Sequence, residues 1–170
     1  MDGSWQGRRV LVLGLGNFGG GAAVVRFLCE QGSRVAVTDL RGEAQLAPVL
    51  DSLQDLEFAT FLGANPPAAL AGAEAVVVNP AVPPTAPLLV EARRRELHLT
   101  SETELLLRHC PAPVTAITGT NGKSTTTALL GHLLRAAGQP VLVGGNLGLS
   151  LLPRLGEITP AHQVVLELSS

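Results

Sequence analysis

The sequence predicts an α/β protein built on parallel sheets. Short apolar runs, which are typical of buried parallel strands, alternate with segments of helical periodicity along the 170 residues. Two of these runs end in glycine-rich loops that are followed by helical segments. Hydrophobic residues make up 46% of the chain, which is enough apolar material for a packed core.

The first series of elements fills residues 1–110, which we interpret as one domain. Apolar runs predict its strands at residues 9–13, 34–38, 57–62, 75–78 and 97–100. Helical patterns predict helices at residues 19–31, 43–53, 66–71 and 87–96. A last helix is expected to run from the capping box of residues 101–104 to His109.

A second series of elements begins after two prolines. Pro111 and Pro113 stop the preceding helix, so we place a linker at residues 111–113 and a second domain at residues 114–170. Strands are expected at residues 114–118, 141–143 and 163–168, and helices at residues 123–137 and 149–155. We expect the last strand to leave an unpaired edge in its sheet unless that sheet is covered.

Composition excludes several classes of protein. The net charge of −2 provides no basic surface for nucleic acid, and no apolar run reaches the length of about 18 residues that a transmembrane helix needs. Residues 1–7 do not resemble a signal peptide, and Cys29 and Cys110 lack the spacing of a disulfide framework or a metal knuckle. We therefore expect a cytoplasmic protein without membrane insertion. We also expect it to be a monomer.

The first glycine-rich loop, Gly14-Leu15-Gly16-Asn17-Phe18-Gly19, has the form G-x-G-x-x-G between a predicted strand and a predicted helix. Asp39 ends the next strand, where a carboxylate can accept hydrogen bonds from a ribose or a base. Arg41 would suit NADP or would be solvated. The pattern predicts a Rossmann-like domain that binds a dinucleotide or a nucleotide diphosphate. A tight turn without a ligand is the alternative.

The second loop contains the one lysine among twelve basic residues. Lys123 lies in Gly119-Thr120-Asn121-Gly122-Lys123-Ser124-Thr125, which has the G-x-x-G-K-S form of a phosphate cradle, although Ile117 stands where the usual motif begins with glycine. The lysine would contact phosphates as a compact charge, and the Ser124 hydroxyl would take a Mg²⁺ position. The loop predicts ATP or GTP binding and the start of a P-loop ATPase-type α/β central domain.

Taken together, these motifs resemble those of the Mur ligase family. The resemblance covers nearly the whole chain. It rests on the two loops, on Val37-Thr38-Asp39-Leu40-Arg41, Asn79-Pro80-Ala81-Val82 and Thr103-Glu104-Leu105, and on Gly144-Gly145-Asn146-Leu147-Gly148 and Leu166-Glu167-Leu168-Ser169-Ser170.

The resemblance implies an ATP-dependent amide ligase that adds D-glutamate to UDP-N-acetylmuramoyl-L-alanine through an acyl phosphate. It implies that ATP is bound by Gly119, Thr120, Asn121, Gly122, Lys123, Ser124 and Thr125, with Lys123 catalytic, and Mg²⁺ by Ser124 and Glu167. It implies that the UDP substrate is bound by Gly14, Leu15, Gly16, Asn17, Phe18, Gly19, Asp39, Leu40, Arg41, Asn79, Ala81 and Asn146. A ligase of this superfamily for another amino acid, a folylpolyglutamate-type ligase and an NAD(P)-binding module stay open.

The sequence departs from the family pattern in two places. Asn79 and Ala81 stand where the family has serine and glycine, and alanine adopts positive φ less freely than glycine does. The family also continues beyond this sequence, through more of the ATP domain and a further C-terminal domain. We therefore expect the 170 residues by themselves to show weak turnover or none.

Overall fold

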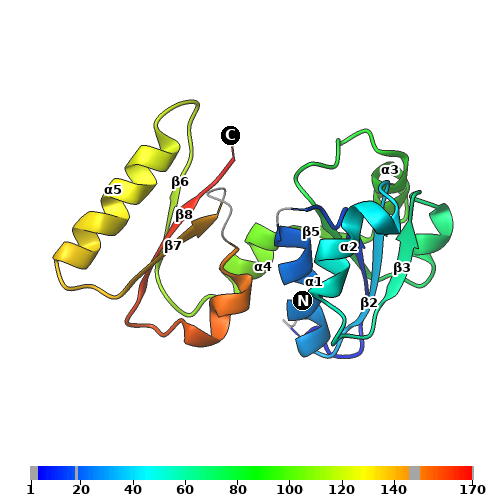
Figure 1. The fold of residues 1–170 in the computed structure, drawn as a ribbon, viewed down its shortest axis with the longest axis horizontal. Coiled ribbons are helices and arrows are strands. Elements are labelled where there is room, and N and C mark those ends of the chain that lie inside the picture. Colours follow the sequence, from blue (N-terminus) through cyan, green and yellow to red (C-terminus); the bar gives the residue numbers. More distant parts are fainter. Residues whose placement is uncertain (1–3, 18, 146–149, 170) are drawn as a thin grey trace. The chain divides into compact units, whose positions relative to one another are not determined.

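The computed structural model describes residues 4–17, 19–145 and 150–169. The chain divides into two compact units, Met1–Glu104 and Leu105–Ser170 (Figure 1). This division falls inside a helix that begins at Glu102, a few residues before the expected linker. The domain boundary at residues 111–113 stays a prediction.

Five parallel strands form the sheet of the first unit, in the order β3-β2-β1-β4-β5. The strands are β1 Arg9–Leu13, β2 Arg34–Asp39, β3 Ala59–Leu62, β4 Ala75–Val78 and β5 His98–Thr100. The helices are α1 Gly20–Glu30, α2 Glu43–Asp51, α3 Pro87–Arg94 and the short 3₁₀ helix η1 Pro67–Leu70. Helix α4, Glu102–His109, spans the division between the two units. The predicted α/β class with parallel sheets is confirmed. Strand order reverses at β1, the kind of position at which ligands bind in open α/β sheets.

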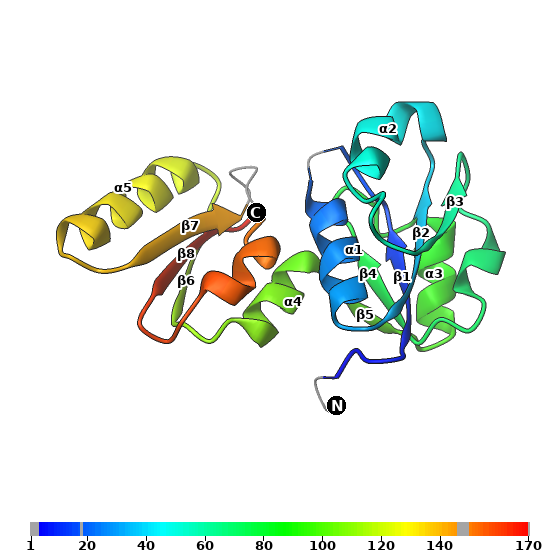
Figure 2. The ribbon, with the colours of Figure 1, turned by 60° about the horizontal axis from the view of Figure 1, so that its bottom comes forward.

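Strand β1 is central and has buried side chains on both of its faces. Leu11 and Leu13 belong to a cluster completed by η1, β4 and α3 residues: Ala69, Leu70, Val76, Leu88, Leu89 and Ala92. Because side chains alternate along a strand, Val10 and Val12 face the opposite side, where α1 lies. Figure 2 shows α1 and α3 on opposite sides of this sheet. This packing holds the carboxyl ends of β1, β2 and β4 at one edge.

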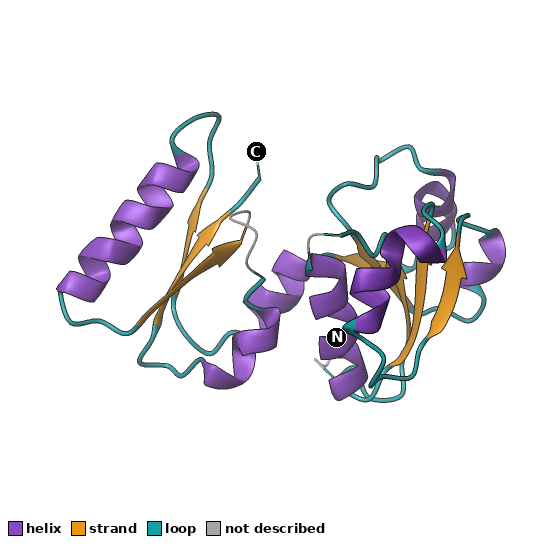
Figure 3. Ribbon diagram, in the orientation of Figure 1, coloured by secondary structure: helices purple, strands orange, loops and turns teal. Residues whose placement is uncertain are grey.

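Three parallel strands form the sheet of the second unit, in the order β6-β8-β7. The elements are β6 Val114–Ile117, α5 Lys123–Ala136, β7 Val141–Gly145, the 3₁₀ helix η2 Leu152–Glu157 and β8 Gln163–Glu167. Figure 3 shows α5 lying along one face of this sheet.

The expectation that the last strand is an edge is wrong. Strand β8 pairs with both β6 and β7 and is the central strand. Its residues Val164, Val165 and Leu166 are at most 1% exposed. Such a continuous apolar run is what a strand covered on both faces requires.

Most elements agree with the sequence patterns, and the differences have local causes. Strand β3 begins at Ala59 rather than at residue 57. The helix expected at residues 149–155 is η2, which begins with Leu152 and has Pro153 in its first turn. Helix α4 begins as expected after Ser101, whose Oγ accepts a hydrogen bond from the Glu104 amide at 3.2 Å. Over the described ranges, no helix is long and apolar enough to cross a membrane.

Candidate functional site

The first glycine loop joins β1 to α1 at the point where the strand order reverses. Gly14 and Gly16 have φ values of +87° and +70°, which side chains rarely adopt. A Cβ atom on Gly21 would collide with the carbonyl oxygen of Leu15. The glycines therefore allow the start of α1 to approach the loop closely.

Asp39, at the end of β2, holds this loop in place. Its Oδ2 accepts hydrogen bonds from the amides of Leu15 and Gly16 at 3.0 and 3.1 Å. Its Oδ1 accepts from the amide and Nε of Arg41, both at 3.0 Å, and Nη2 of Arg41 lies 2.8 Å from Oδ2. Burial raises the pKa of Asp39, but the bonds from Arg41 and Gly16 outweigh it and lower the pKa to about 2. The carboxylate is therefore ionised, and protein donors occupy both of its oxygens.

A cavity of about 480 Å³ lies at the carboxyl ends of these strands. It is large enough for a small ligand. Seven of the expected substrate residues line it, namely Gly14, Gly16, Asp39, Leu40, Arg41, Asn79 and Ala81. Leu40 is 71% exposed at this surface, which is unusual for a leucine. Three other expected residues of the first glycine-rich loop do not line this cavity, namely Leu15, Asn17 and Gly19.

Asn79 supports the turn that follows β4. Its side-chain Oδ1 accepts a hydrogen bond from the backbone amide of Ala81 at 2.9 Å. Its backbone amide donates a hydrogen bond to the carbonyl oxygen of Leu13 at 3.0 Å. Among the described residues, Glu96 is the one non-glycine residue with positive φ. Ala81 therefore takes the place of the family's glycine without backbone strain.

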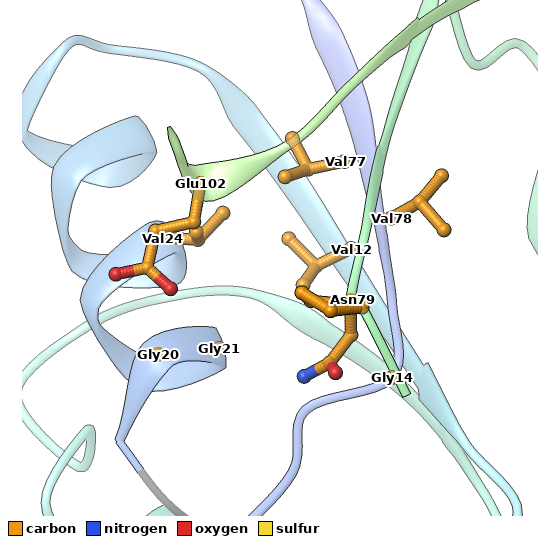
Figure 4. Close-up of a pocket in the computed structure, with 10 residues that line it drawn as sticks. Val12, Gly14, Gly20, Gly21, Val24, Val77, Val78, Asn79 and Glu102 are labelled. Carbon is orange, nitrogen blue, oxygen red and sulfur yellow. The ribbon is translucent and has the colours of Figure 1, made fainter. Parts of the chain in front are cut away.

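A second, small cavity of about 10 Å³ lies between α1 and the ends of β1 and β4. Figure 4 shows the Glu102 side chain reaching toward the first residues of α1. A Cβ atom on Gly20 would collide with this carboxylate. The negative charge thus lies near the positive end of the α1 dipole. The sequence patterns did not single out Glu102, because its position depends on how α4 packs.

The second loop leads from β6 into α5, and residues 119–125 all lie in the described part of the chain. Gly122 precedes α5 with φ of 74°, and Lys123 is the first residue of the helix. The Nζ atom of Lys123 donates to the carbonyl of Gly119 at 2.6 Å. The ammonium group is thus folded back onto the loop carbonyls.

Glu167 ends β8 beside this loop. It pairs with Ile117, the last residue of β6, and with Gly145, the last residue of β7. The residue is 3% exposed, and its Oε2 atom is buried without a hydrogen-bond partner, as is Oγ1 of Thr127. A buried carboxylate oxygen without a partner is costly, so its environment favours a cation. In the part of the chain that the structure describes, no group of three or more His, Cys, Asp and Glu could hold a metal.

Two expected site residues, Phe18 and Asn146, lie outside the described residues. Asn65 is a residue that the sequence patterns missed. It follows β3 and lines the large cavity. Its position after a strand at the same edge of the sheet was the available signal.

Solved structures of Mur ligases share this fold. UDP-N-acetylmuramate-alanine ligase MurC from Thermotoga maritima superimposes with a TM-score of 0.54 at 24% identity, covering 95% of this chain and 37% of that chain. A murein peptide ligase from Psychrobacter arcticus superimposes with a TM-score of 0.55 at 21% identity, covering 94% and 37%.

The sequence places the chain more narrowly. The family model of the Mur ligase MurD-like N-terminal domain matches residues 8–101, and the chain belongs to this family. UDP-N-acetylmuramoylalanine–D-glutamate ligase from Roseiflexus sp. is 46% identical over 164 residues, which are 96% of this chain and 35% of that protein. The ligase of the same name from Trichlorobacter lovleyi is 45% identical over 165 residues, covering 96% and 36%. The expected membership of the Mur ligase family is confirmed, and the chain spans about a third of the length of these relatives.

Proposed function

We propose that the chain belongs to a ligase that adds D-glutamate to UDP-N-acetylmuramoyl-L-alanine in the synthesis of peptidoglycan precursors. Residues 1–110 would bind the UDP substrate, and residues 114–170 would begin the P-loop ATP-binding central domain. Relatives that are 45% and 46% identical carry this activity in their names. The observation that carries the proposal is the cavity of about 480 Å³ at the carboxyl ends of β1, β2 and β4 in a chain of this family.

The UDP group would lie in this cavity. Asp39 holds the amides of Leu15 and Gly16, which keeps the loop in the shape that places Gly14 and Gly16 on the cavity. The guanidinium of Arg41 supplies positive charge beside it, and the exposed side chain of Leu40 offers an apolar surface for a base. The amides of Leu15 and Gly16 are taken by Asp39, so the side-chain amide of Asn79, the surface of Gly14, Gly16 and Ala81, and the start of α1 would face the diphosphate. Asn146 would contact the muramoyl group.

The ATP phosphates would lie on residues 119–125. Lys123 would leave the carbonyl of Gly119 and contact the β- and γ-phosphates. The buried Oε2 of Glu167 and the hydroxyl of Ser124 fit a Mg²⁺ ion, with the remaining ligands supplied by phosphate and water oxygens. When bound, the ion neutralises charge on the transferred phosphoryl group.

In the proposed reaction, a carboxylate oxygen of UDP-N-acetylmuramoyl-L-alanine attacks the γ-phosphorus of ATP, and ADP leaves. The amine of D-glutamate then attacks the carbonyl carbon of the acyl phosphate. Phosphate leaves, the amine loses a proton, and an amide remains. This chain's part is to bind and orient the UDP substrate and to hold the phosphates through Lys123.

We also propose that the protein acts in the cytoplasm as a monomer. Cys29 and Cys110 carry free thiols, which fits a reducing compartment. Sedimentation equilibrium measures the oligomeric state directly, and a single species of 17.6 kDa is expected.

Isothermal titration tests the proposed substrate. The chain is expected to bind UDP-N-acetylmuramoyl-L-alanine and to bind neither NADH nor NADPH. A Rossmann-type cofactor needs a strand-end carboxylate that accepts hydrogen bonds from its ribose, whereas the oxygens of Asp39 already accept bonds from protein donors. Binding of NADPH without binding of the UDP substrate would overturn the proposal.

A further inference from the structure

Thr127 is a buried polar residue that the proposed function does not use. It is fully buried, and its Oγ1 atom has no hydrogen-bond partner. A threonine inside a helix can donate its hydroxyl hydrogen to a carbonyl oxygen one turn earlier, but Thr127 does not. A buried hydroxyl without a partner is costly, so its surroundings favour an acceptor. Among the described residues, the other buried side-chain oxygen without a partner is Oε2 of Glu167.

The packing of α5 brings Thr127 to the level of Glu167 along the sheet. The buried residues of α5 are Thr127 and Gly131, and a Cβ atom on Gly131 would collide with the side chain of Val143 in β7. Helix α5 follows the carboxyl end of β6 and leads back to the start of β7, so it runs opposite to the strands (Figure 1). Thr127 lies one turn, about 6 Å, before Gly131, which is as far toward the carboxyl ends as two strand residues beyond Val143. That strand position is Gly145, which pairs with Glu167.

The strand register turns the side chain of Glu167 toward α5. Val143 faces α5, because its side chain is the one that Gly131 approaches. Paired residues of adjacent parallel strands point to the same face of a sheet, and Val143 pairs with Val165. Side chains alternate along a strand, so Glu167, two residues after Val165 in β8, points to that face as well. The two unpaired oxygens therefore lie on the same side of the sheet, between α5 and the carboxyl end of β8.

We propose that Thr127 positions the Glu167 carboxylate for Mg²⁺ by donating its hydroxyl hydrogen to it. A carboxylate that binds a metal is usually held by a hydrogen bond from a neighbouring group, and loss of that group costs about 10- to 100-fold in metal affinity. The carboxylate has about four lone pairs, so it can bind Mg²⁺ and accept this bond at the same time. The inference rests on the proposed function, because it takes Glu167 as a Mg²⁺ ligand. Thr127 acts through Glu167 and is a positioning residue.

The test measures the affinity of the 170-residue chain for ATP by titration, once with Mg²⁺ and once with EDTA in its place. Thr127→Val keeps the shape of the side chain without the hydroxyl. Its affinity for ATP should fall about tenfold with Mg²⁺ and stay unchanged without it. Thr127→Ser keeps the hydroxyl and should retain most of the effect of Mg²⁺. Thr126→Val makes the same change at an exposed neighbour in α5 and should behave like the unsubstituted chain.

The stability of the protein without ligand separates positioning from packing. Thr127→Val removes a buried hydroxyl that has no partner, so its Tm without ligand should equal or exceed that of the unsubstituted chain. A merely structural role of the hydroxyl would instead lower this Tm and weaken ATP binding equally with and without Mg²⁺.

Glu167→Gln, titrated in the same way, distinguishes failure of the inference from failure of the proposed function. An unchanged effect of Mg²⁺ in folded Thr127→Val, or equal losses with and without Mg²⁺, would overturn the inference. A smaller effect of Mg²⁺ in Glu167→Gln would still uphold the proposed metal site in that case. If the unsubstituted chain bound no ATP, or if Glu167→Gln kept the full effect of Mg²⁺, the proposed site would fail together with the inference.

Discussion

Asp39 is the residue whose surroundings say most about the site. A strand-end carboxylate in a G-x-G-x-x-G domain suggests a direct ligand contact, yet here it accepts bonds from the loop amides and from Arg41. Its role in the structure is to hold the loop. We propose that ligand recognition falls to other residues that line the cavity, such as Leu40.

Replacing Asp39 by asparagine should destabilise the protein in a pH-dependent way. The folded-state pKa is lowered to about 2, whereas an unfolded aspartate titrates near 3.9, so the carboxylate stabilises the fold above about pH 4. This contribution is lost as the pH falls through about 2. We expect Asp39→Asn to lower the unfolding free energy by about 1–3 kcal/mol at pH 7, measured by urea denaturation. A difference from the unsubstituted chain that stayed constant between pH 7 and pH 2 would contradict this account.

A second prediction at the residue scale concerns the binding of Mg²⁺ by Glu167. Its buried, unpartnered Oε2 should be satisfied by Mg²⁺ bound together with ATP. We expect ATP with Mg²⁺ to raise the Tm of the unsubstituted chain and to have a much smaller effect on Glu167→Gln. Glu157→Gln is the matched control, because Glu157 is exposed and paired with Arg154. Equal Tm shifts in Glu167→Gln and the control would show that Glu167 does not bind the metal.

At the scale of elements, the approach of α1 to the first loop is the feature most sensitive to substitution. Gly21→Ala should lower the unfolding free energy by about 1–3 kcal/mol, because its Cβ would overlap the Leu15 carbonyl oxygen. Gly156→Ala, where nothing lies within 4 Å of the added Cβ, should change it by less than about 0.5 kcal/mol. Chemical denaturation of both variants measures the difference. Equal stabilities would mean that the close approach is not required.

The sequence predicted elements better than their arrangement, and the reason is physical. An apolar run that ends in glycine identified β1 with its observed bounds, because that signal is local. The insertion of β8 between β6 and β7 depends on contacts between distant segments, although the unbroken apolar run of β8 was consistent with it.

The candidate site follows the same rule. Residues within motifs, such as Gly14, Gly16 and Asp39, line the cavity, and their role in binding a ligand stays a prediction. Asn65 belongs to no motif, and only the packing of β3 brings it to the cavity. Glu102 belongs to the capping box of α4, which did not indicate that its side chain lies beside the start of α1. The sequence also did not indicate that both oxygens of Asp39 accept hydrogen bonds from protein donors.

At the scale of the whole molecule, each unit has its own proposed nucleotide. We propose that the nucleotide of the UDP substrate binds to the first unit, where Leu40 is exposed at the cavity. ATP is proposed to bind to the second, which contains the chain's one lysine. Substitutions at the cavity of the first unit should therefore leave ATP binding unaffected, and substitutions in residues 119–125 should leave binding of the UDP substrate unaffected.

The affinity for UDP-N-acetylmuramoyl-L-alanine, measured by titration in Leu40→Asp and Lys123→Ala, tests this central claim most directly. Leu40 is 71% exposed, so its substitution should preserve the fold. The substitution replaces the proposed apolar surface for the base by a charge, which should weaken binding by about tenfold. Lys123→Ala should bind the substrate as tightly as the unsubstituted chain does. No binding by the unsubstituted chain, or equal losses in the two variants, would contradict the account.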